Sequence, residues 1–276
     1  MRSWTRPSLP SARSSRGASV ATRPPVPDVV IGGAPRSGTT FLAQALQRHP
    51  GIFLAQPIAP EPKVCLRDHP DGDAGLLADY ARFFAAAPAG TQRVEKTTNY
   101  LENDAARPRL ARVLPDARFL FILREPVARA YSNWKWSTKN GLETLPFERA
   151  VALEGQRPNP LGPEREAARP FDYMLRGRYG SFARAWYEQF GRSRVHFVLF
   201  EDAVRDPEGF FARLQAWLGV AVLPWSALRI GRVNATADDM AGLEPALAAR
   251  LRAAIRPEVD DFAGLTGLDL SPWALD

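Results

Sequence analysis

The chain has few of the residues that build metal centres and covalent cross-links. Cys65 is the only cysteine among the 276 residues, so neither a disulfide within the chain nor a cluster of thiolate ligands can form. The three histidines, His49, His69 and His196, lie far apart in the sequence and follow no ligand spacing. We therefore expect a protein without a bound metal.

Long apolar runs are also absent. No stretch approaches the roughly 20 apolar residues that a membrane-spanning helix needs. Residues 1–27 are rich in Arg, Ser and Pro and lack the apolar segment of a secretory signal. We expect these residues to form a disordered N-terminal segment, and we expect no membrane span and a cytoplasmic location.

Lysine is scarce, although the chain as a whole is basic. The net charge of +6 and the isoelectric point near 9.8 favour an anionic partner, such as a nucleotide, a polyanionic sugar or a nucleic acid. The only lysines are Lys63, Lys96, Lys135 and Lys139. Each of them is therefore more informative than any one of the many arginines.

The composition and the order of the predicted elements indicate one globular domain. With 45% hydrophobic and 24% charged residues, the chain is able to bury a core. Strand and helix patterns alternate, and no second linker rich in Pro and Gly separates them. We predict an α/β domain over residues 28–276, with a central, mostly parallel sheet flanked by helices. The sequence carries no signal for the oligomeric state.

The segment Val29–Thr40, VVIGGAPRSGTT, predicts a buried strand, a Gly-rich turn and the first turn of a helix. Backbone N–H groups and the positive end of the helix dipole converge at such a turn and favour a phosphate. The spacing of Gly33 and Gly38 matches the phosphate-binding loop of nucleoside triphosphatases, but Thr39 replaces its lysine and the cation is Arg36. An ordinary strand-to-helix turn would need neither three glycines nor this arginine, so we predict a P-loop-like anion site.

A second strand-to-helix unit carries another pair of anion-binding residues. The run Ala117–Leu123 is typical of a central parallel strand, and Arg124 follows it directly. A helix is predicted from Pro126 to Lys139, and Ser132 lies roughly 9–10 Å from its start. The long guanidinium and the hydroxyl can meet on one small anion. An ordinary salt bridge is the alternative for Arg124.

Two further charged side chains are predicted near the carboxyl ends of strands, where ligands bind in open α/β sheets. Glu61 projects from the proline-rich loop 57–62, and Lys96 ends the strand predicted in RVEKTTNY. Taken alone, Glu61 is better explained as a solvated loop charge. Lys96 is explained equally well by a surface ion pair and by a role in catalysis.

The C-terminal half contains further predicted elements. Residues 154–169 are rich in proline and charge, which predicts a mobile loop over the site. His196 lies within a predicted strand and is expected to be a core histidine. A loop containing Arg229, Arg232 and Asn234 precedes a helix predicted for residues 245–255.

Taken together, several segments resemble the sulfotransferases that use 3′-phosphoadenosine 5′-phosphosulfate (PAPS). The resemblance covers residues 29–276 and is greatest to bacterial enzymes similar to the heparan-sulfate and carbohydrate sulfotransferases. It depends on the order and spacing of two phosphate motifs rather than on either one alone. The segments are APRSGTT, PEPK, EKTTNYL, FLFILREPVARAYSNW and, further on, the segment around Tyr179 with LFEDAVRDP.

The resemblance implies how the donor is bound. The Gly-rich loop of this family holds the 5′-phosphosulfate, which implies binding by Arg36 and by the backbone at Ser37, Gly38, Thr39 and Thr40. Many members carry lysine where this chain has Arg36. Arginine keeps the charge but changes the reach and the hydrogen-bond geometry.

The resemblance also implies that Arg124 and Ser132 bind the 3′-phosphate, since the family has the same interval of eight residues between them. It adds Tyr179 to the residues that bind the donor. For the basic loop that covers the donor in this family, Arg229, Arg232 and Asn234 are the best candidates, and Arg232 is assigned to donor binding.

The reaction implied by the resemblance is in-line transfer of a sulfuryl group from PAPS to an acceptor hydroxyl of a carbohydrate or a small natural product. Glu61 would be the general base, and Lys96 and Arg36 would neutralise the sulfuryl and bridging oxygens. This transfer needs no metal. No nucleic-acid partner is expected.

Two other functions are compatible with parts of the sequence. A P-loop kinase or nucleotide phosphohydrolase would use the same type of loop, but it would carry lysine at the position of Thr39. A basic protein that binds nucleic acid or another polyanion without catalysis would explain the net charge. Magnesium-dependent ATP turnover would favour the first, and salt-dependent DNA binding without nucleotide preference the second.

Overall fold

The computed structural model describes residues 25–228 and 240–273. The strands are β1 (Val29–Gly33), β2 (Ile52–Leu54), β3 (Gln92–Lys96), β4 (Arg118–Leu123) and β5 (Val195–Leu199). The longer helices are α1 (Thr39–Leu46), α2 (Gly72–Phe83), α3 (Ala106–Val113), α4 (Pro126–Lys139), α6 (Tyr179–Phe190), α8 (Pro207–Leu218) and α10 (Pro245–Thr266). Short helical segments are η1 (Val64–Leu66), α5 (Phe147–Ala152), η2 (Pro163–Ala168), η3 (Leu175–Gly177), α7 (Phe200–Arg205), α9 (Trp225–Leu228) and η4 (Ser271–Trp273).

The strands form one parallel sheet in the order β2-β3-β1-β4-β5. Strand β1 lies at its centre, between β3 and β4, and the chain leaves β1 first toward one edge of the sheet and later toward the other. Such a change of direction is where open α/β sheets bind ligands, beyond the carboxyl ends of the strands. The predicted fold class, a parallel sheet flanked by helices with a P-loop-like turn, is confirmed.

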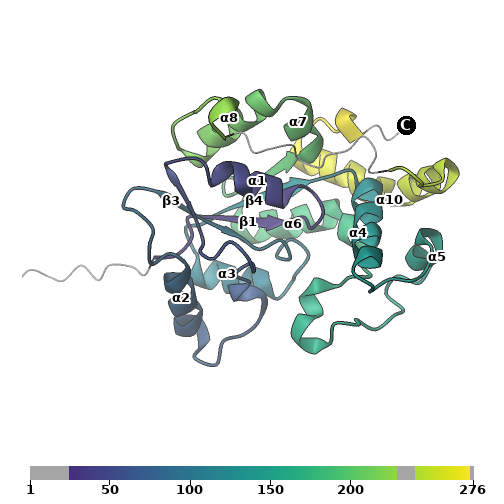
Figure 1. The fold of residues 1–276 in the computed structure, drawn as a ribbon, viewed down its shortest axis with the longest axis horizontal. Coiled ribbons are helices and arrows are strands. Elements are labelled where there is room, and N and C mark those ends of the chain that lie inside the picture. Colours follow the sequence, from purple (N-terminus) through teal and green to yellow (C-terminus); the bar gives the residue numbers. More distant parts are fainter. Residues whose placement is uncertain (1–24, 229–239, 274–276) are drawn as a thin grey trace, which may run out of the picture.

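Apolar side chains alternate along the central strands and build a core on each face of the sheet. Val29 and Ile31 pack in a cluster with α1 and α8, whereas Val30 belongs to a cluster with α2, α3, α6 and α10. Figure 1 shows α1 and α8 on one side of the sheet and α2 and α3 on the other. Since β1 is buried along its whole length, it needs the continuous apolar run seen in the sequence.

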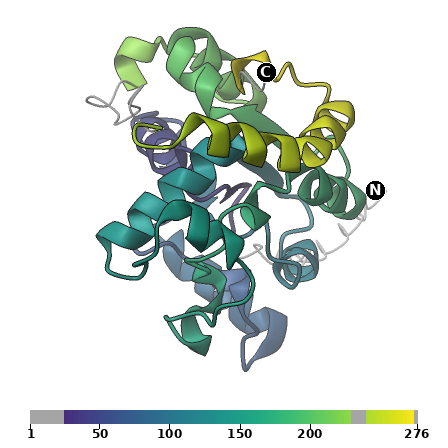
Figure 2. The same ribbon diagram turned by 90° about the vertical axis from the view of Figure 1, so that its right-hand side faces the viewer.

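Helix α10 is longer than the sequence predicts. The prediction ends it at residue 255, before Pro257, but the helix continues to Thr266. Proline costs a helix interior a hydrogen bond, and here the continuation is stabilised by burial of Val259 and Phe262 in the core. Figure 2 shows α10, in yellow, running across the side of the molecule that faces the viewer.

The N-terminal boundary also differs from the prediction. Val26 is only 4% exposed and packs in the same core cluster as Val30, so the packed chain begins before residue 28. The rest of the predicted N-terminal segment, residues 1–24, lies outside the described residues, as do Arg229, Arg232 and Asn234. No helix in the described ranges is long and apolar enough to span a membrane.

Candidate active site

The turn from β1 to α1 is tightly wound. Arg36 and Gly38 both adopt left-handed backbone conformations, with φ of 69° and 84°. A Cβ atom at Gly38 would lie 2.4 Å from the ring of Phe200, which follows β5. Glycine at this position therefore satisfies both the backbone conformation and the close approach of the ring.

The N-terminus of α1 is open. No acidic residue lies in its first turn, and no side chain caps it. The first N–H groups of a helix have no partner within it, and together with the helix dipole they attract an anion. Ser37, directly before this terminus, is fully buried, and its hydroxyl lies near Tyr179 but makes no hydrogen bond of good geometry. An open terminus beside an unsatisfied buried hydroxyl fits the phosphate or sulfate group of a ligand.

The second predicted anion-binding unit lies beside the first. Because β4 pairs with β1, Arg124 leaves the sheet next to the Gly-rich loop. Arg36 Nε donates a hydrogen bond of 3.4 Å to Ser132 Oγ on α4, across 96 residues of sequence. Arg124 and Ser132 are 8% and 7% exposed, and the Arg124 guanidinium lies 5.4 Å from the centre of the Phe200 ring. The fold thus brings Arg36, Arg124 and Ser132 together at the carboxyl end of the sheet.

The N-terminus of α4, unlike that of α1, is already occupied by a carboxylate. Glu125 accepts hydrogen bonds from the N–H groups of Val127 and Ala128, at 3.1 and 2.6 Å. Its own N–H donates to Glu201 Oε1 at 2.9 Å, and Glu201 is held in turn by the indole of Trp273. These contacts fix the turn that carries Arg124, and an anion near α4 would have to be bound by side chains.

Tyr179 supports this turn from within the core. Its side chain is buried, and its hydroxyl donates a 3.0 Å hydrogen bond to the carbonyl of Arg124. Burial raises the pKa of Tyr179 to about 12, so the phenol keeps its proton. The sequence predicts that Tyr179 binds PAPS. In the structure its hydroxyl forms a hydrogen bond to the backbone carbonyl of Arg124.

Glu61 and Lys96 form an ion pair. Lys96 Nζ lies 2.7 Å from Glu61 Oε1, and the side chains are 11% (Lys96) and 17% (Glu61) exposed. The backbone N–H of Thr98 donates to Glu61 Oε2 at 3.1 Å, and its hydroxyl donates to the same carboxylate. The pair lies at the carboxyl end of β3, which neighbours β1, and is sheltered from solvent far more than a surface ion pair.

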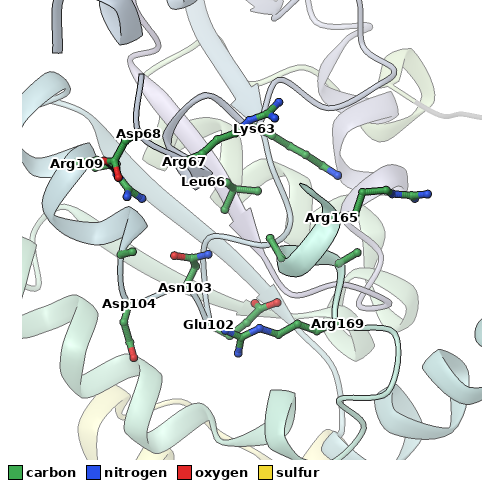
Figure 3. Close-up of a pocket in the computed structure, with 13 residues that line it drawn as sticks. Lys63, Leu66, Arg67, Asp68, Glu102, Asn103, Asp104, Arg109, Arg165 and Arg169 are labelled. Atoms are coloured by element: carbon green, nitrogen blue, oxygen red, sulfur yellow. Dashed lines mark hydrogen bonds and ion pairs between the residues drawn. The ribbon is translucent and has the colours of Figure 1, made fainter. Parts of the chain in front are cut away.

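A groove of about 960 Å³ adjoins the loop of Glu61. Its walls come from side chains within three segments, 63–68, 102–109 and 165–169, and the third segment belongs to the predicted loop 154–169. Figure 3 shows Lys63 and Arg67 on one side of the opening and Glu102 and Arg169 on the opposite side. Asp68 pairs with Arg109 and Glu102 with Arg176, at 2.7 and 3.0 Å.

His196 does not belong to the site at the carboxyl end of the sheet. It is the second residue of β5 and stacks on Trp217 with 4.8 Å between the ring centres. Burial lowers its pKa, so the imidazole is neutral at physiological pH. Among residues 25–228 and 240–273, no group of three or more His, Cys, Asp or Glu side chains lies close enough to hold a metal ion.

Sequence reasoning missed three residues of the site. Phe200 contacts both the Gly-rich loop and Arg124, Glu125 caps α4, and Glu201 holds the turn between β4 and α4. Pro126 marks the start of the helix in the sequence, but glutamate is not one of the usual capping residues, so the cap by Glu125 appears only in the structure. Nothing in the sequence indicates the contacts of Phe200, because they depend on how β5 pairs with β4.

A model of the sulfotransferase family matches residues 58–225. The mouse protein heparan sulfate glucosamine 3-O-sulfotransferase 6 is 30% identical over 194 residues, which are 70% of this chain and 52% of that protein. The human protein heparan sulfate glucosamine 3-O-sulfotransferase 3A1 is 24% identical over 220 residues, or 75% of this chain and 51% of that protein. The chain thus spans about half the length of these curated relatives.

Solved structures share the fold. A sulfotransferase from Alicyclobacillus acidocaldarius is 27% identical with a TM-score of 0.71, over 90% of this chain and 98% of that chain. Mouse sulfotransferase SULT7A1, solved in complex with PAP, has a TM-score of 0.54 at 16% identity, over 87% of each chain. At this identity the second likeness concerns the fold alone.

Proposed function

The chain belongs to the sulfotransferase family, and we propose that it transfers a sulfuryl group from PAPS to a hydroxyl of an anionic carbohydrate. The observation that carries the proposal is the hydrogen bond between Arg36 and Ser132. It joins two anion-binding units at the carboxyl end of the sheet, as a nucleoside with phosphate groups at the 3′ and 5′ positions of its ribose requires. Further support comes from the relatives, which are named as sulfotransferases of heparan sulfate.

The donor side of the site comprises the Gly-rich loop with Arg124 and Ser132. We assign the 5′-phosphosulfate to the open N-terminus of α1, with Ser37, Gly38, Thr39 and Thr40 supplying backbone N–H groups. The 3′-phosphate is assigned to Arg124 and Ser132. Arg36 would bind between the two subsites, since it already reaches Ser132. Tyr179 acts through the backbone of Arg124, and Arg232 keeps its predicted role as a covering residue.

The acceptor side comprises the Glu61–Lys96 pair and the adjoining groove. PAPS supplies the sulfuryl group and, in 3′,5′-adenosine bisphosphate, its leaving group. Glu61 takes the proton of the acceptor hydroxyl as the oxygen attacks sulfur, so that one S–O bond forms while the bond to the bridging oxygen breaks. Lys96 positions Glu61 through an ion pair with 2.7 Å between Nζ and Oε1. Together with Arg36, it neutralises charge on the sulfuryl and bridging oxygens.

The groove is the proposed site of the acceptor. Lys63 and Arg67 lie on exposed positions of its wall, directly after the loop that carries Glu61. Cationic side chains on that wall favour an acceptor with carboxylate or sulfate groups over a neutral one. The carbohydrate class follows the names of the relatives, and a small anionic natural product is an alternative outcome of an acceptor screen.

A thermal-shift experiment tests which nucleotide the protein binds and distinguishes a sulfotransferase from a P-loop kinase or phosphohydrolase. We expect 3′,5′-adenosine bisphosphate to raise the melting temperature of the protein, and ATP with magnesium to have a much smaller effect. Transfer of radiolabelled sulfate from PAPS to a uronic-acid oligosaccharide then tests the reaction. Stabilisation by ATP with magnesium alone, together with ATP turnover, would replace this proposal by a P-loop kinase or phosphohydrolase. The cytoplasmic location stays a prediction that cell fractionation can test.

A further inference from the structure

Glu95 is a buried carboxylate with an unusual set of partners. Its side chain is fully buried in β3, and no lysine or arginine in the described ranges forms an ion pair with it. Three hydroxyls donate to its oxygens instead: Thr97 at 2.8 Å, Tyr100 at 3.0 Å and Tyr80 at 2.8 Å. A buried charge without a countercharge is costly, so its position needs an explanation beyond packing.

Two of these hydroxyls also bind the loop that follows Glu61. The backbone N–H of Lys63 donates to Thr97 Oγ1 at 3.0 Å, and that of Cys65 donates to Tyr100 Oη at 3.1 Å. Each hydroxyl accepts from the loop and gives its single proton to Glu95. The loop is therefore anchored to the carboxylate through two chains of hydrogen bonds that run in the same direction.

The anchored backbone lies next to the proposed chemistry. Lys63 is two residues beyond Glu61 and has a left-handed conformation, with φ of 58°, which its surroundings must stabilise. On the other side, Lys96 lies between Glu95 and Thr97 in the sequence, and neighbouring strand residues point to opposite faces. Both members of the Glu61–Lys96 pair are thus within two residues of the Glu95 network.

We propose that Glu95 is a positioning residue for the proposed transfer: acting through Thr97 and Tyr100, its carboxylate fixes residues 61–65 and thereby the general base Glu61. The inference rests on the proposed function, because it assigns Glu95 a part in placing that base. It also assigns the wall of the groove at Lys63 to the same anchor.

The anchor depends on the charge of Glu95. A carboxylate accepts all three hydroxyl protons, whereas a protonated carboxyl must donate one itself. Tyr80 is the hydroxyl that can turn away, because Tyr100 Oη and Cys65 Sγ lie 3.4 and 3.5 Å from its oxygen. Protonation of Glu95 therefore rearranges the network beneath the loop.

Glu95 is the member of this network that titrates near neutrality. Burial raises its pKa to about 7; hydrogen bonds from Thr97, Tyr80 and Tyr100 oppose the rise, and the charge of Glu61 adds to it. Burial also raises the pKa of Cys65 to about 12 and keeps both tyrosines neutral. Two other charged groups face the network, Arg109 on α3 and Asp73 on α2, and both act on Cys65.

A pair of substitutions at Thr97 tests the anchor. Thr97→Val removes the hydroxyl at nearly constant volume, and we expect kcat to fall about tenfold because the N–H of Lys63 loses its partner. Thr97→Ser keeps the hydroxyl and should stay within about twofold of the wild type. The affinity for 3′,5′-adenosine bisphosphate should be the same in all three proteins. Equal kcat in Thr97→Val and Thr97→Ser, or an equal loss of nucleotide affinity, would overturn the proposal.

The pH dependence of kcat distinguishes a positioning role of Glu95 from a merely structural one, because a structural role would not change this dependence. The wild type should lose kcat as pH falls below about 7, as Glu95 takes up a proton. Tyr80→Phe removes one hydrogen bond that lowers the pKa of Glu95 and touches no N–H of the loop. We expect this variant to shift the limb of the profile to higher pH. A limb that stays in place would contradict the proposal.

A measurement without turnover separates this proposal from the proposed function. Native-state hydrogen exchange should show the Lys63 amide protected in the wild type and in Thr97→Ser but exposed in Thr97→Val. If the wild type transfers no sulfuryl group yet shows this pattern, the proposed function fails while the anchor stands. If transfer occurs and the Lys63 amide is equally protected in all three proteins, the anchor fails alone.

Discussion

On the donor side, each anion-binding unit is one continuous piece of chain, a buried strand, a turn and a helix. Arg36 and Ser37 lie in the first turn, and Arg124 opens the second. On the acceptor side, no single segment is sufficient. Glu61 depends on Lys96, 35 residues later, and the groove takes its walls from three separate segments.

The difference has a physical consequence. The donor side binds an anion with groups whose placement follows from strand ends and a helix terminus, so a local change should affect affinity. The acceptor side positions Glu61 through Lys96, Thr98 and the buried network of Glu95. A change there should affect turnover and its pH dependence while nucleotide affinity stays constant.

The largest effect is expected for Glu61→Gln. Loss of a general base lowers kcat by about 10²–10⁴-fold, and the neutral amide keeps much of the shape of the side chain. Affinity for 3′,5′-adenosine bisphosphate should change by less than about twofold, because Glu61 lies on the acceptor side. Turnover assays and isothermal titration on the same preparations measure both. A parallel loss of affinity would remove the distinction between the two sides.

The next effect concerns stability and pH. Burial raises the pKa of Glu95 from 4.5 to about 7 in the folded state, so folding takes up a proton between these values. The unfolding free energy should therefore fall as pH rises from about 5 to about 8, by at most about 3 kcal/mol. In Glu95→Gln this contribution to the pH dependence of the unfolding free energy should vanish. Urea titrations at several pH values measure it.

Glu154 provides a control for the pH experiment. Burial raises its pKa to about 7 as well, but it holds the backbone of Met174 and Leu175 rather than the loop of Glu61. Glu154→Gln should reduce the slope of stability with pH and leave the pH limb of kcat in place. If it moved the limb of kcat, Glu95 would not be the group responsible.

Arg124→Ala tests the donor side. The loss of a charged donor should weaken binding of 3′,5′-adenosine bisphosphate about 10- to 100-fold. The affinity of Arg124→Lys should lie between those of the wild type and Arg124→Ala, since an ammonium group keeps the charge but cannot form the paired hydrogen bonds of a planar guanidinium group. Arg213→Ala, an exposed arginine on α8, is the matched control and should bind as the wild type does. Unchanged affinity in Arg124→Ala would remove this residue from the donor side.

The smallest effect is expected at the wall of the groove. Arg67 is exposed, and its replacement by alanine should raise KM for an anionic oligosaccharide about two- to fivefold at low salt. The effect should shrink at high salt, and KM for PAPS should not change. If KM for a neutral acceptor rose equally, charge would not be the reason for the preference.

Much of the fold and part of the site could be predicted from the sequence. The buried strands and helix α4, from Pro126 to Lys139, follow from apolar runs and a proline at the helix start. The residues proposed for both sides of the site could be named from the sequence and the family resemblance. The extension of α10 through Pro257 could not be predicted, because burial of Val259 and Phe262 outweighs a local signal to end the helix.

The parallel α/β fold and the two strand-turn-helix units follow from local patterns in the amino-acid sequence, because apolar periodicity, glycine and proline act over a few residues. Tertiary packing alone brings Arg36 to Ser132, Glu61 to Lys96 and the hydroxyl of Tyr179 to the backbone carbonyl of Arg124. It also decided that a carboxylate beneath the site, Glu95, is bonded by hydroxyls rather than by a cation. The contacts of Arg36, Glu61 and Tyr179 join residues 96, 35 and 55 positions apart, and the order of the strands in the sheet brings these partners together.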